Sequence, residues 1–164
     1  MNKYFNPFQT QELRFPSEYR ESVEKFTQTR GTGATSPPSR SPFPRMVDIW
    51  WLAVCVGANR DKREQVPRDK MHKFIEGSIL SSDPWRVEQL CLLAIGFTGN
   101  AEVLRNPADL IQLANDLAAG GMPIVLEWLQ SGRSDPIWNL SDRIAEGGRT
   151  PRPPAEGTLS VNVR

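Results

Sequence analysis

The residues most able to support catalysis or to bind metal are few in this chain. The 164 residues include a single histidine, His72, and two cysteines, Cys55 and Cys91. A lone histidine without a nearby cysteine does not predict a zinc site, which needs three or four ligands. Each cysteine lies in an apolar run with no charged neighbour that would lower the pKa of its thiol, so we expect buried free thiols. No phosphate-binding glycine loop, G-x-S-x-G elbow or H-E-x-x-H motif occurs. We expect no catalytic residue, metal or cofactor.

The acidic residues do not change this expectation. A metal-dependent nuclease would need grouped carboxylates, and the sequence has no E-x-K or D-x-K triplet. Scattered acids such as Asp83, Glu88 and Glu102 are typical of a solvated surface. An enzyme is therefore the least favoured class.

One basic stretch, residues 60–73, offers a different chemistry. It holds six Lys or Arg residues and three acids, and could contact phosphate groups of DNA. Its aromatic content is too low for stacking on single strands. The alternative is a solvated loop between helices. The DNA hypothesis assigns binding to Arg60, Lys62, Arg63, Arg68 and Lys70.

The aromatic residues favour a protein partner instead. Tryptophan and other aromatic residues often anchor interfaces. Trp50, Trp51, Trp85 and Trp128 lie on apolar faces and are expected in the core. The partner-binding candidates lie outside the predicted body: Phe5, Phe8, Phe15, Tyr19, Phe26 and Trp138.

The elements that would position these residues are predicted to be helical. Residues 1–30 form an N-terminal arm with an amphipathic helix over 17–29, and residues 31–44, rich in Pro, Ser and Gly, form a linker. Residues 45–131 form a helical domain, and 132–164 an extension, with a marginal helix over 135–146, followed by a flexible tail. The predicted fold class is all-α: a small compact bundle of about five helices, an N-terminal helical arm and a disordered C-terminal tail.

Within the domain, local signals set the predicted helices. The apolar run 45–58 predicts a central helix, buried on most sides and ended by Gly57. A short helix is expected over 68–80. Ser82-Asp83-Pro84 and Asn106-Pro107 each combine a capping side chain with proline at the first turn, so helices are expected from there. Gly120-Gly121 predicts the end of the second of these, followed by a short helix over 122–130.

Three stretches resemble the family of DNA phosphorothioation (dnd) system-associated protein 4. They are IWWLAVCVGANRDKRE (Ile49 to Glu64), LCLLAIGFTGNAEVL (Leu90 to Leu104) and LANDLAAGGMPIVLEWL (Leu113 to Leu129), and they occur in the family's order. The resemblance covers about residues 47–131. Gly96-Phe97-Thr98 departs from the acidic, polar helix end that the family often shows.

This resemblance implies an accessory protein encoded with anti-phage genes linked to DNA modification, without catalytic residues. The resulting hypothesis is a non-catalytic interaction subunit of a bacterial defence complex that binds a larger protein partner through its arm. Self-association stays open, and contact with DNA would be indirect. The alternative is a DNA-binding accessory module that uses the basic stretch.

Charge and hydropathy limit the cellular setting. The formal net charge of +1 gives no global signature of a nucleic-acid binder. The N-terminus lacks the apolar core of a signal peptide, and the longest apolar stretch, Ile49 to Val56, is too short to cross a bilayer. We therefore expect a cytoplasmic protein without membrane contact.

Overall fold

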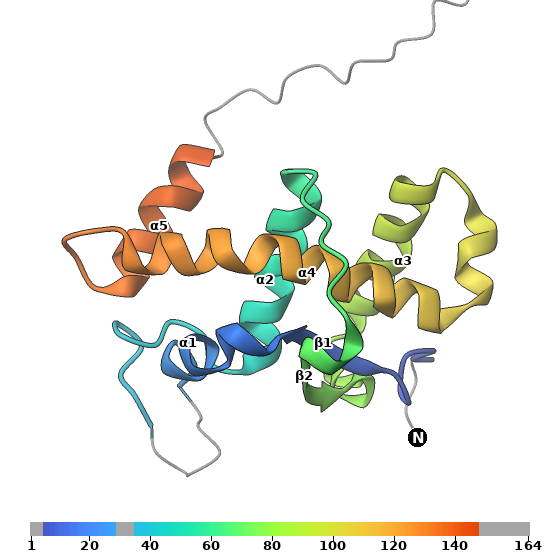
Figure 1. Ribbon diagram of the computed structural model, residues 1–164, viewed down its shortest axis with the longest axis horizontal. Coiled ribbons are helices and arrows are strands. Elements are labelled where there is room, and N and C mark those ends of the chain that lie inside the picture. The colour runs from blue at the N-terminus through green and yellow to red at the C-terminus, as the bar shows by residue number, and fades with distance from the viewer. Residues whose placement is uncertain (1–4, 29–34, 148–164) are drawn as a thin grey trace, which may run out of the picture.

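Two helices that pack closely together, α2 (Met46–Asn59) and α4 (Pro107–Gln130), form the centre of the protein. The computed structural model describes residues 5–28 and 35–147 (Figure 1). The prediction of a central helix is confirmed in α2, where Ile49, Trp50, Ala53 and Val54 are fully buried. Because its apolar residues lie on most sides, α2 can contact several other elements at once.

Glycines make this helix crossing close. A Cβ added to Gly121 of α4 would lie 1.9 Å from the carbonyl oxygen of Ala53 in α2. One added to Gly57 of α2 would lie 2.1 Å from the carbonyl oxygen of Leu117 in α4. The predicted helix ends at Gly57 and at Gly120-Gly121 are therefore wrong. Both helices continue past these glycines, whose missing side chains allow backbone contact.

A small antiparallel sheet corrects the all-α prediction. The protein is mostly helical, but β1 (Glu12–Pro16) pairs with β2 (Met71–Glu76), with Phe15 opposite His72. The helix expected over 68–80 is wrong, since two 3₁₀ helices, η2 (Arg68–Lys70) and η3 (Gly77–Ser82), flank β2 there. The apolar spacing of a short segment does not distinguish a strand from a helix. The deciding hydrogen-bond partner lies far away in the sequence.

Strand β1 also bonds to α4 through one side chain. The Asn115 amide nitrogen donates to the Glu12 carbonyl at 3.1 Å, and its oxygen accepts from the Arg14 amide at 2.9 Å. In addition, the Trp50 indole donates to the Arg14 carbonyl at 3.1 Å. The backbone of β1 is thus satisfied by two helices as well as by β2.

The N-terminal segment belongs to the packed body. The helical part of the predicted arm is shorter than expected, comprising η1 (Ser17–Tyr19) and α1 (Arg20–Lys25). Residues 29–34, which comprise the end of the predicted arm and the start of the predicted linker (31–44), lie outside the described residues. The rest packs on this segment, because Gln28 donates its amide to the Phe43 carbonyl at 2.8 Å and the Phe43 side chain is buried.

Both predicted helix starts are confirmed. Helix α3 (Pro84–Thr98) begins at Pro84, although the Asp83 side chain forms no capping hydrogen bond, and Gly99, with a left-handed φ of 68°, follows its last residue. Helix α4 begins at Pro107, with the Asn106 side chain accepting from the Ala108 amide at 3.2 Å.

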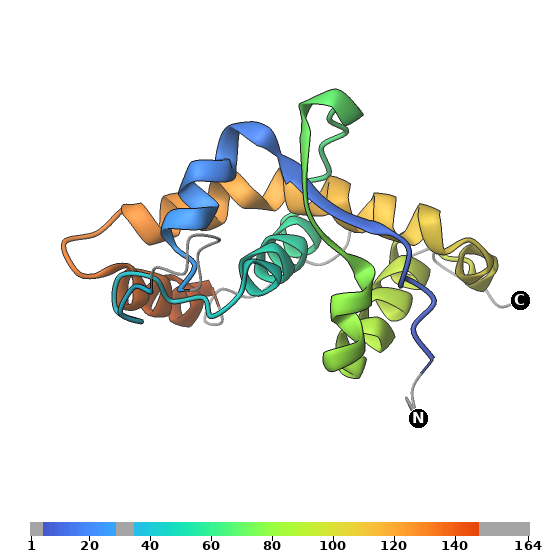
Figure 2. The same ribbon diagram turned by 90° about the horizontal axis from the view of Figure 1, so that it is seen from below.

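The remaining elements flank α4. Helix η4 (Ala101–Arg105) joins α3 to α4, and α5 (Pro136–Gly147) follows α4. Figures 1 and 2 show α3 and η4 beside one end of α4 and α5 beside the other. The predicted flexible tail, 148–164, lies outside the described residues. Within the described residues, no helix combines the length and apolar character needed to span a membrane.

Candidate interaction surface

Most of the aromatic residues expected to bind a partner lie inside the protein. Phe8, Phe15 and Phe26 are fully buried or nearly so, and Tyr19 is partly buried against the same core. They are buried because β1 pairs with β2 and α1 packs beside α2. These side chains therefore stabilise the fold and offer no exposed docking face, which corrects the docking-arm interpretation.

Two of the predicted partner-binding residues are exposed, but they lie far apart. Phe5 has 88% of its surface exposed and lines a small hollow of about 70 Å³ beside the start of α3. Trp138 is 62% exposed and lies on α5, at the other end of α4. The structure does not bring these two residues together into one surface.

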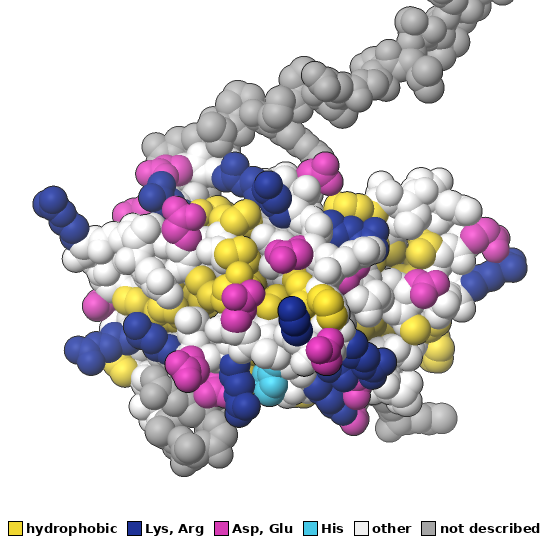
Figure 3. All heavy atoms as spheres, viewed as in Figure 1, with side chains coloured by type: hydrophobic (Ala, Val, Ile, Leu, Met, Phe, Trp, Pro, Cys, Tyr) yellow, Lys and Arg dark blue, Asp and Glu magenta, His cyan; other side chains and the backbone are white. Residues whose placement is uncertain are grey.

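The basic stretch also does not form one surface. Between α2 and β2 it runs extended across the outside of α4, so its two ends are separated (Figure 1). On the face shown in Figure 3, Lys and Arg side chains are scattered in separate groups with acidic side chains beside them. Among the described residues, ion pairs occupy Arg63, Arg68 and Lys73, while none is formed by Arg60, Lys62 or Lys70. This arrangement weakens the DNA-binding alternative.

Arg63 has a structural contact. Its guanidinium donates to the carboxylate of Asp116 on α4 at 3.1 and 3.2 Å, and the Asp116 side chain is only 2% exposed. We expect Arg63→Ala to lower the free energy of unfolding by about 2 kcal/mol, because it leaves a buried carboxylate without its cation. Urea denaturation measures this. The matched change Arg60→Ala should have almost no effect, and equal costs for the two would contradict a structural role for Arg63.

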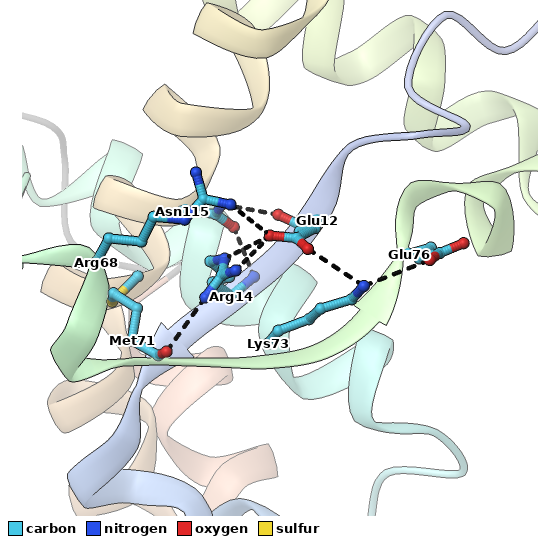
Figure 4. A network of polar contacts seen from close by, with 7 residues as sticks. All are labelled: Glu12, Arg14, Arg68, Met71, Lys73, Glu76 and Asn115. Atoms are coloured by element: carbon cyan, nitrogen blue, oxygen red, sulfur yellow. Dashed lines mark hydrogen bonds and ion pairs between the residues drawn. The ribbon is translucent and has the colours of Figure 1, made fainter.

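Arg68 and Lys73 meet at one carboxylate. Glu12 of β1 accepts from Arg68 at 2.9 Å, forms an ion pair with Lys73 at 3.2 Å, and also pairs with Arg14 (Figure 4). Hydrogen bonds from Arg14 and then Lys73 lower the pKa of Glu12 from 4.5 to about 2. This carboxylate therefore links β1 to β2 and to the segment before it.

The lowered pKa of Glu12 predicts acid sensitivity. A carboxylate with a lower pKa in the folded state adds stability above its unfolded pKa and loses it as the pH falls through the folded value. We expect Glu12→Gln to cost about 1–2 kcal/mol at pH 7, after allowance for solvent screening. The difference from the unmodified protein should shrink below pH 4.5 and vanish near pH 2. Urea denaturation across this range tests it, with Glu76→Gln as control. A difference that is constant with pH would contradict the assignment.

The single histidine and the two cysteines pack against other side chains of the fold. The His72 ring contacts the Phe15 ring edge-on at 5.4 Å between centroids. Burial is the main cause that lowers the pKa of His72, and the positive charge of Arg20 lowers it further. Burial raises the pKa of both the Cys55 and the Cys91 thiol, so both are protonated at neutral pH. Across residues 5–28 and 35–147, no three His, Cys, Asp or Glu side chains are grouped to hold a metal ion.

Helix α3 exposes Trp85, which the sequence assigned to the core, and also Leu92. Its inner stripe of Arg86, Leu90 and Ala94 is buried, whereas Trp85 is 49% and Leu92 61% exposed. Positions 85, 88, 92 and 96 share one side of a helix with 3.6 residues per turn, and a Cβ added at Gly96 would meet nothing within 4 Å. We call Trp85, Glu88, Leu92 and Gly96 the outer face of α3. The core assignment of Trp85 is therefore wrong.

Two large exposed hydrophobic residues, Trp85 and Leu92, lie on this face. Phe97, near the end of α3, and Leu104, on η4, are also exposed but do not share the face. Single exposed apolar residues are ordinary on protein surfaces, but neighbouring ones on one helix face are typical of interaction sites. Sequence reasoning missed this surface, although α3 has few neighbours that could cover all of its apolar residues.

A buried arginine holds Trp85 in place. Arg86 is only 6% exposed, donates to the Asp48 carboxylate at 2.7 Å and lies 3.4 Å from that of Asp83. The rings of Trp85 and Trp51 lie near its guanidinium carbon, with centroid distances of 4.9 and 5.9 Å, and contact each other edge-on. Such contacts between a cation and an aromatic ring are attractive. They fix an exposed indole against a rigid support.

Asp48 stays ionised in this cluster. Burial alone would raise the pKa of Asp48, but hydrogen bonds from Arg45 and Arg86 outweigh it and lower the pKa overall. Arg45 also bonds to Asp83 at 2.9 Å. Two arginines and two carboxylates thus join the start of α2 to the start of α3.

The outer face itself carries negative charge. Its exposed charged residue is Glu88, and Arg86, the one basic residue of α3, points inward. Among the described residues, Glu88 forms no ion pair. The surface is therefore an apolar centre with an acidic neighbour and no basic group on the same helix face.

Comparison with known proteins gives no relative for this chain: no protein family, no curated protein and no solved structure matches it.

Proposed function

We propose that this chain is a non-catalytic protein-binding subunit that docks on a larger partner through the outer face of α3. The observation that carries the proposal is the exposed Trp85, which the buried Arg86 supports and which Leu92 follows two helical turns later. Rigid tryptophans with packed supports are frequent binding hot spots. The docking surface differs from the N-terminal arm that the sequence suggested, because most aromatic residues of that arm are buried.

The proposed occupant is an amphipathic helix of the partner that carries apolar anchors and nearby Lys or Arg residues. A helix face with anchors spaced at 85 and 92 suits a second helix laid along it. Glu88 favours a basic residue opposite. A second copy of the chain would instead bring Glu88 near another α3 that has no outward base, so charge favours a different protein.

The proposed setting is a bacterial anti-phage complex linked to DNA modification. This part of the proposal rests on the resemblance over residues 47–131 alone. The outer face of α3 overlaps the second resembling stretch, Leu90 to Leu104, so the resemblance and the docking surface involve the same helix. Contact with DNA would be made by the partner, since the basic stretch is divided and partly ion-paired.

The test compares capture of the partner by tagged variants of the full chain in its native host. We expect Trp85→Ala to weaken partner binding by about 2 kcal/mol, roughly 30-fold, as for a hot-spot residue. Leu92→Asp should abolish capture, because it places a charge at the centre of the apolar face. Quantitative mass spectrometry of the captured protein and calorimetry with the purified partner measure these losses.

The control variants make similar substitutions at exposed apolar residues of a different helix, α5. Trp138→Ala and Ile144→Asp remove exposed apolar groups from α5 and should leave binding unchanged. A partner that binds Leu92→Asp as well as the unmodified chain would refute the docking surface. Light scattering adds a second criterion: a dimer of the free chain that Leu92→Asp dissociates would assign the face to a second copy instead.

A further inference from the structure

A polar hollow whose lining includes no residue of α3 has no role in this docking function. It has a volume of about 440 Å³ and lies between β1, the residues before β2 and the first turns of α4. This volume is in the range of small-molecule sites. Its lining combines the polar and charged groups of Thr10, Gln11, Glu12, Arg14, Arg68 and Asn115 with apolar side chains that include Met71 and Ile111.

Positive charge exceeds negative charge at this hollow. Three cations, Arg14, Arg68 and Lys73, surround the single carboxylate of Glu12 (Figure 4). Glu76, which pairs with Lys73 at 3.3 Å, is the only other acid in the network among the described residues. Three positive and two negative groups leave one uncompensated positive charge.

The start of α4 lies at the same hollow but adds little net charge. Ala108, Ile111 and Gln112, in its first two turns, line the hollow, and the amino end of a 24-residue helix carries partial positive charge. The Asp109 carboxylate in the first turn offsets this charge, and the amides of Ala108, Asp109 and Leu110 already donate to Asn106. The two guanidinium groups therefore supply the attraction for an anion.

Arg68 is the group best placed to bind a ligand. Arg14 uses its three guanidinium nitrogens on Glu12 and on the Met71 carbonyl. Arg68 bonds to Glu12 through one nitrogen, and its side chain is 80% exposed. Its other guanidinium N–H groups donate to no other described residue, so they can reach a second acceptor without breaking the fold.

We propose that this hollow binds a small molecule through a phosphate or carboxylate group, with Arg68 as its main ligand-binding residue. The anionic group binds at the Arg68 guanidinium. The remainder of the molecule packs against Met71 and Ile111. Arg14 supplies long-range attraction, and Glu12 holds Arg68 over the hollow when no ligand is bound. Guanidinium groups bind both classes of anion with paired hydrogen bonds.

Glu12 gives the proposal a specific signature. Its carboxylate competes with an incoming anion for Arg68, so its removal should strengthen binding although it removes a polar group from the hollow. A hollow that served only to fill space around an ion-pair network would show no such gain.

The experiment measures binding of three probes to the full chain by calorimetry and by NMR of the arginine Nε–H groups: inorganic phosphate, adenosine monophosphate and citrate. We expect Arg68→Ala to weaken binding by about tenfold or more, the usual effect of losing a charge-assisted hydrogen bond. Arg60→Ala removes an equal charge at the other end of the segment and should change affinity less than about twofold. Glu12→Gln should tighten binding about threefold.

The probes separate the two sources of the anion. Binding of the phosphate-bearing probes alone assigns a phosphate ligand, and binding of citrate alone assigns a carboxylate ligand. Equal losses in Arg68→Ala and Arg60→Ala would indicate unspecific attraction and overturn the site, as would the absence of binding by all three probes. Since Trp85 and Leu92 lie elsewhere, partner capture by Arg68→Ala should be normal, so failure of this site and failure of the docking function are distinguishable.

Discussion

Replacing Gly121 with alanine is expected to lower the free energy of unfolding by about 3 kcal/mol or more, at the upper end of overpacking effects. The added Cβ would lie 1.9 Å from the Ala53 carbonyl oxygen and 2.8 Å from the Gly57 amide nitrogen. Both neighbours are backbone atoms of α2, so no side chain can rotate away. The two central helices would have to separate, and the core that they share would lose close contacts. Urea denaturation followed by circular dichroism measures the change.

Gly96→Ala is the matched control, because it is the same substitution in a helix. A Cβ at position 96 meets nothing within 4 Å, so alanine should stabilise α3 by up to about 1 kcal/mol through its higher helix propensity. The two substitutions should therefore have opposite signs. If Gly121→Ala also stabilised the protein, the close crossing of α2 and α4 would be incorrect.

The sequence could predict the parts of the fold that depend on local signals, but not those that depend on contacts between distant segments. The starts of α3 and α4 were predictable because Asp83-Pro84 and Asn106-Pro107 act within one helical turn. The role of Gly121 depends on α2, which lies far away in the sequence. By its local property a double glycine predicts the end of a helix, and the tertiary contact with α2 overrides that tendency.

The sheet was unpredictable for a related reason. Phe15 and Phe74 fit helical spacings within their own segments, and only the pairing of β1 with β2 brings their rings to 5.2 Å. That pairing also buries Phe15, which the sequence placed on a tethered arm. Local periodicity cannot reveal a strand partner about sixty residues away.

The candidate surface could not be predicted because the apolar residues of α3 extend beyond one stripe. The helical spacing of Leu90 and Ala94 is consistent with their burial, but it does not show which of the other apolar residues are exposed. In the structure the inward stripe begins with a charged residue, Arg86, and Trp85 faces outward. The signal that could have indicated this is the pair of carboxylates at Asp48 and Asp83, since a buried arginine requires such partners.

Replacing Asp48 with alanine is expected to lower the free energy of unfolding by about 3 kcal/mol, as in other cases where one member of a buried ion pair is removed. Arg86 would remain buried with only the Asp83 carboxylate, 3.4 Å away. The start of α2 would also lose its capping box, in which the Arg45 amide donates to Asp48 at 2.9 Å. Chemical denaturation at neutral pH measures the loss.

A second substitution should partly reverse this loss. Arg86→Met keeps most of the side-chain volume and removes the buried charge, so alone it should cost only about 1 kcal/mol, with Asp48 still paired to Arg45. The double variant should be more stable than Asp48→Ala by about 1 kcal/mol, because no uncompensated charge is left in the interior. Simple addition of the two single losses would show that Asp48 and Arg86 act independently, contrary to their 2.7 Å contact.

Arg86→Met also separates the shape of the docking surface from its rigidity. The variant keeps Trp85 and Leu92 but removes the guanidinium that lies 4.9 Å from the Trp85 ring. If Trp85 binds well because it is held in place, partner affinity should fall in Arg86→Met although every exposed residue of the outer face is unchanged. The Trp85 indole should then show greater mobility by NMR relaxation. Unchanged affinity with a mobile indole would mean that the apolar area alone, and not the support from Arg86, determines docking.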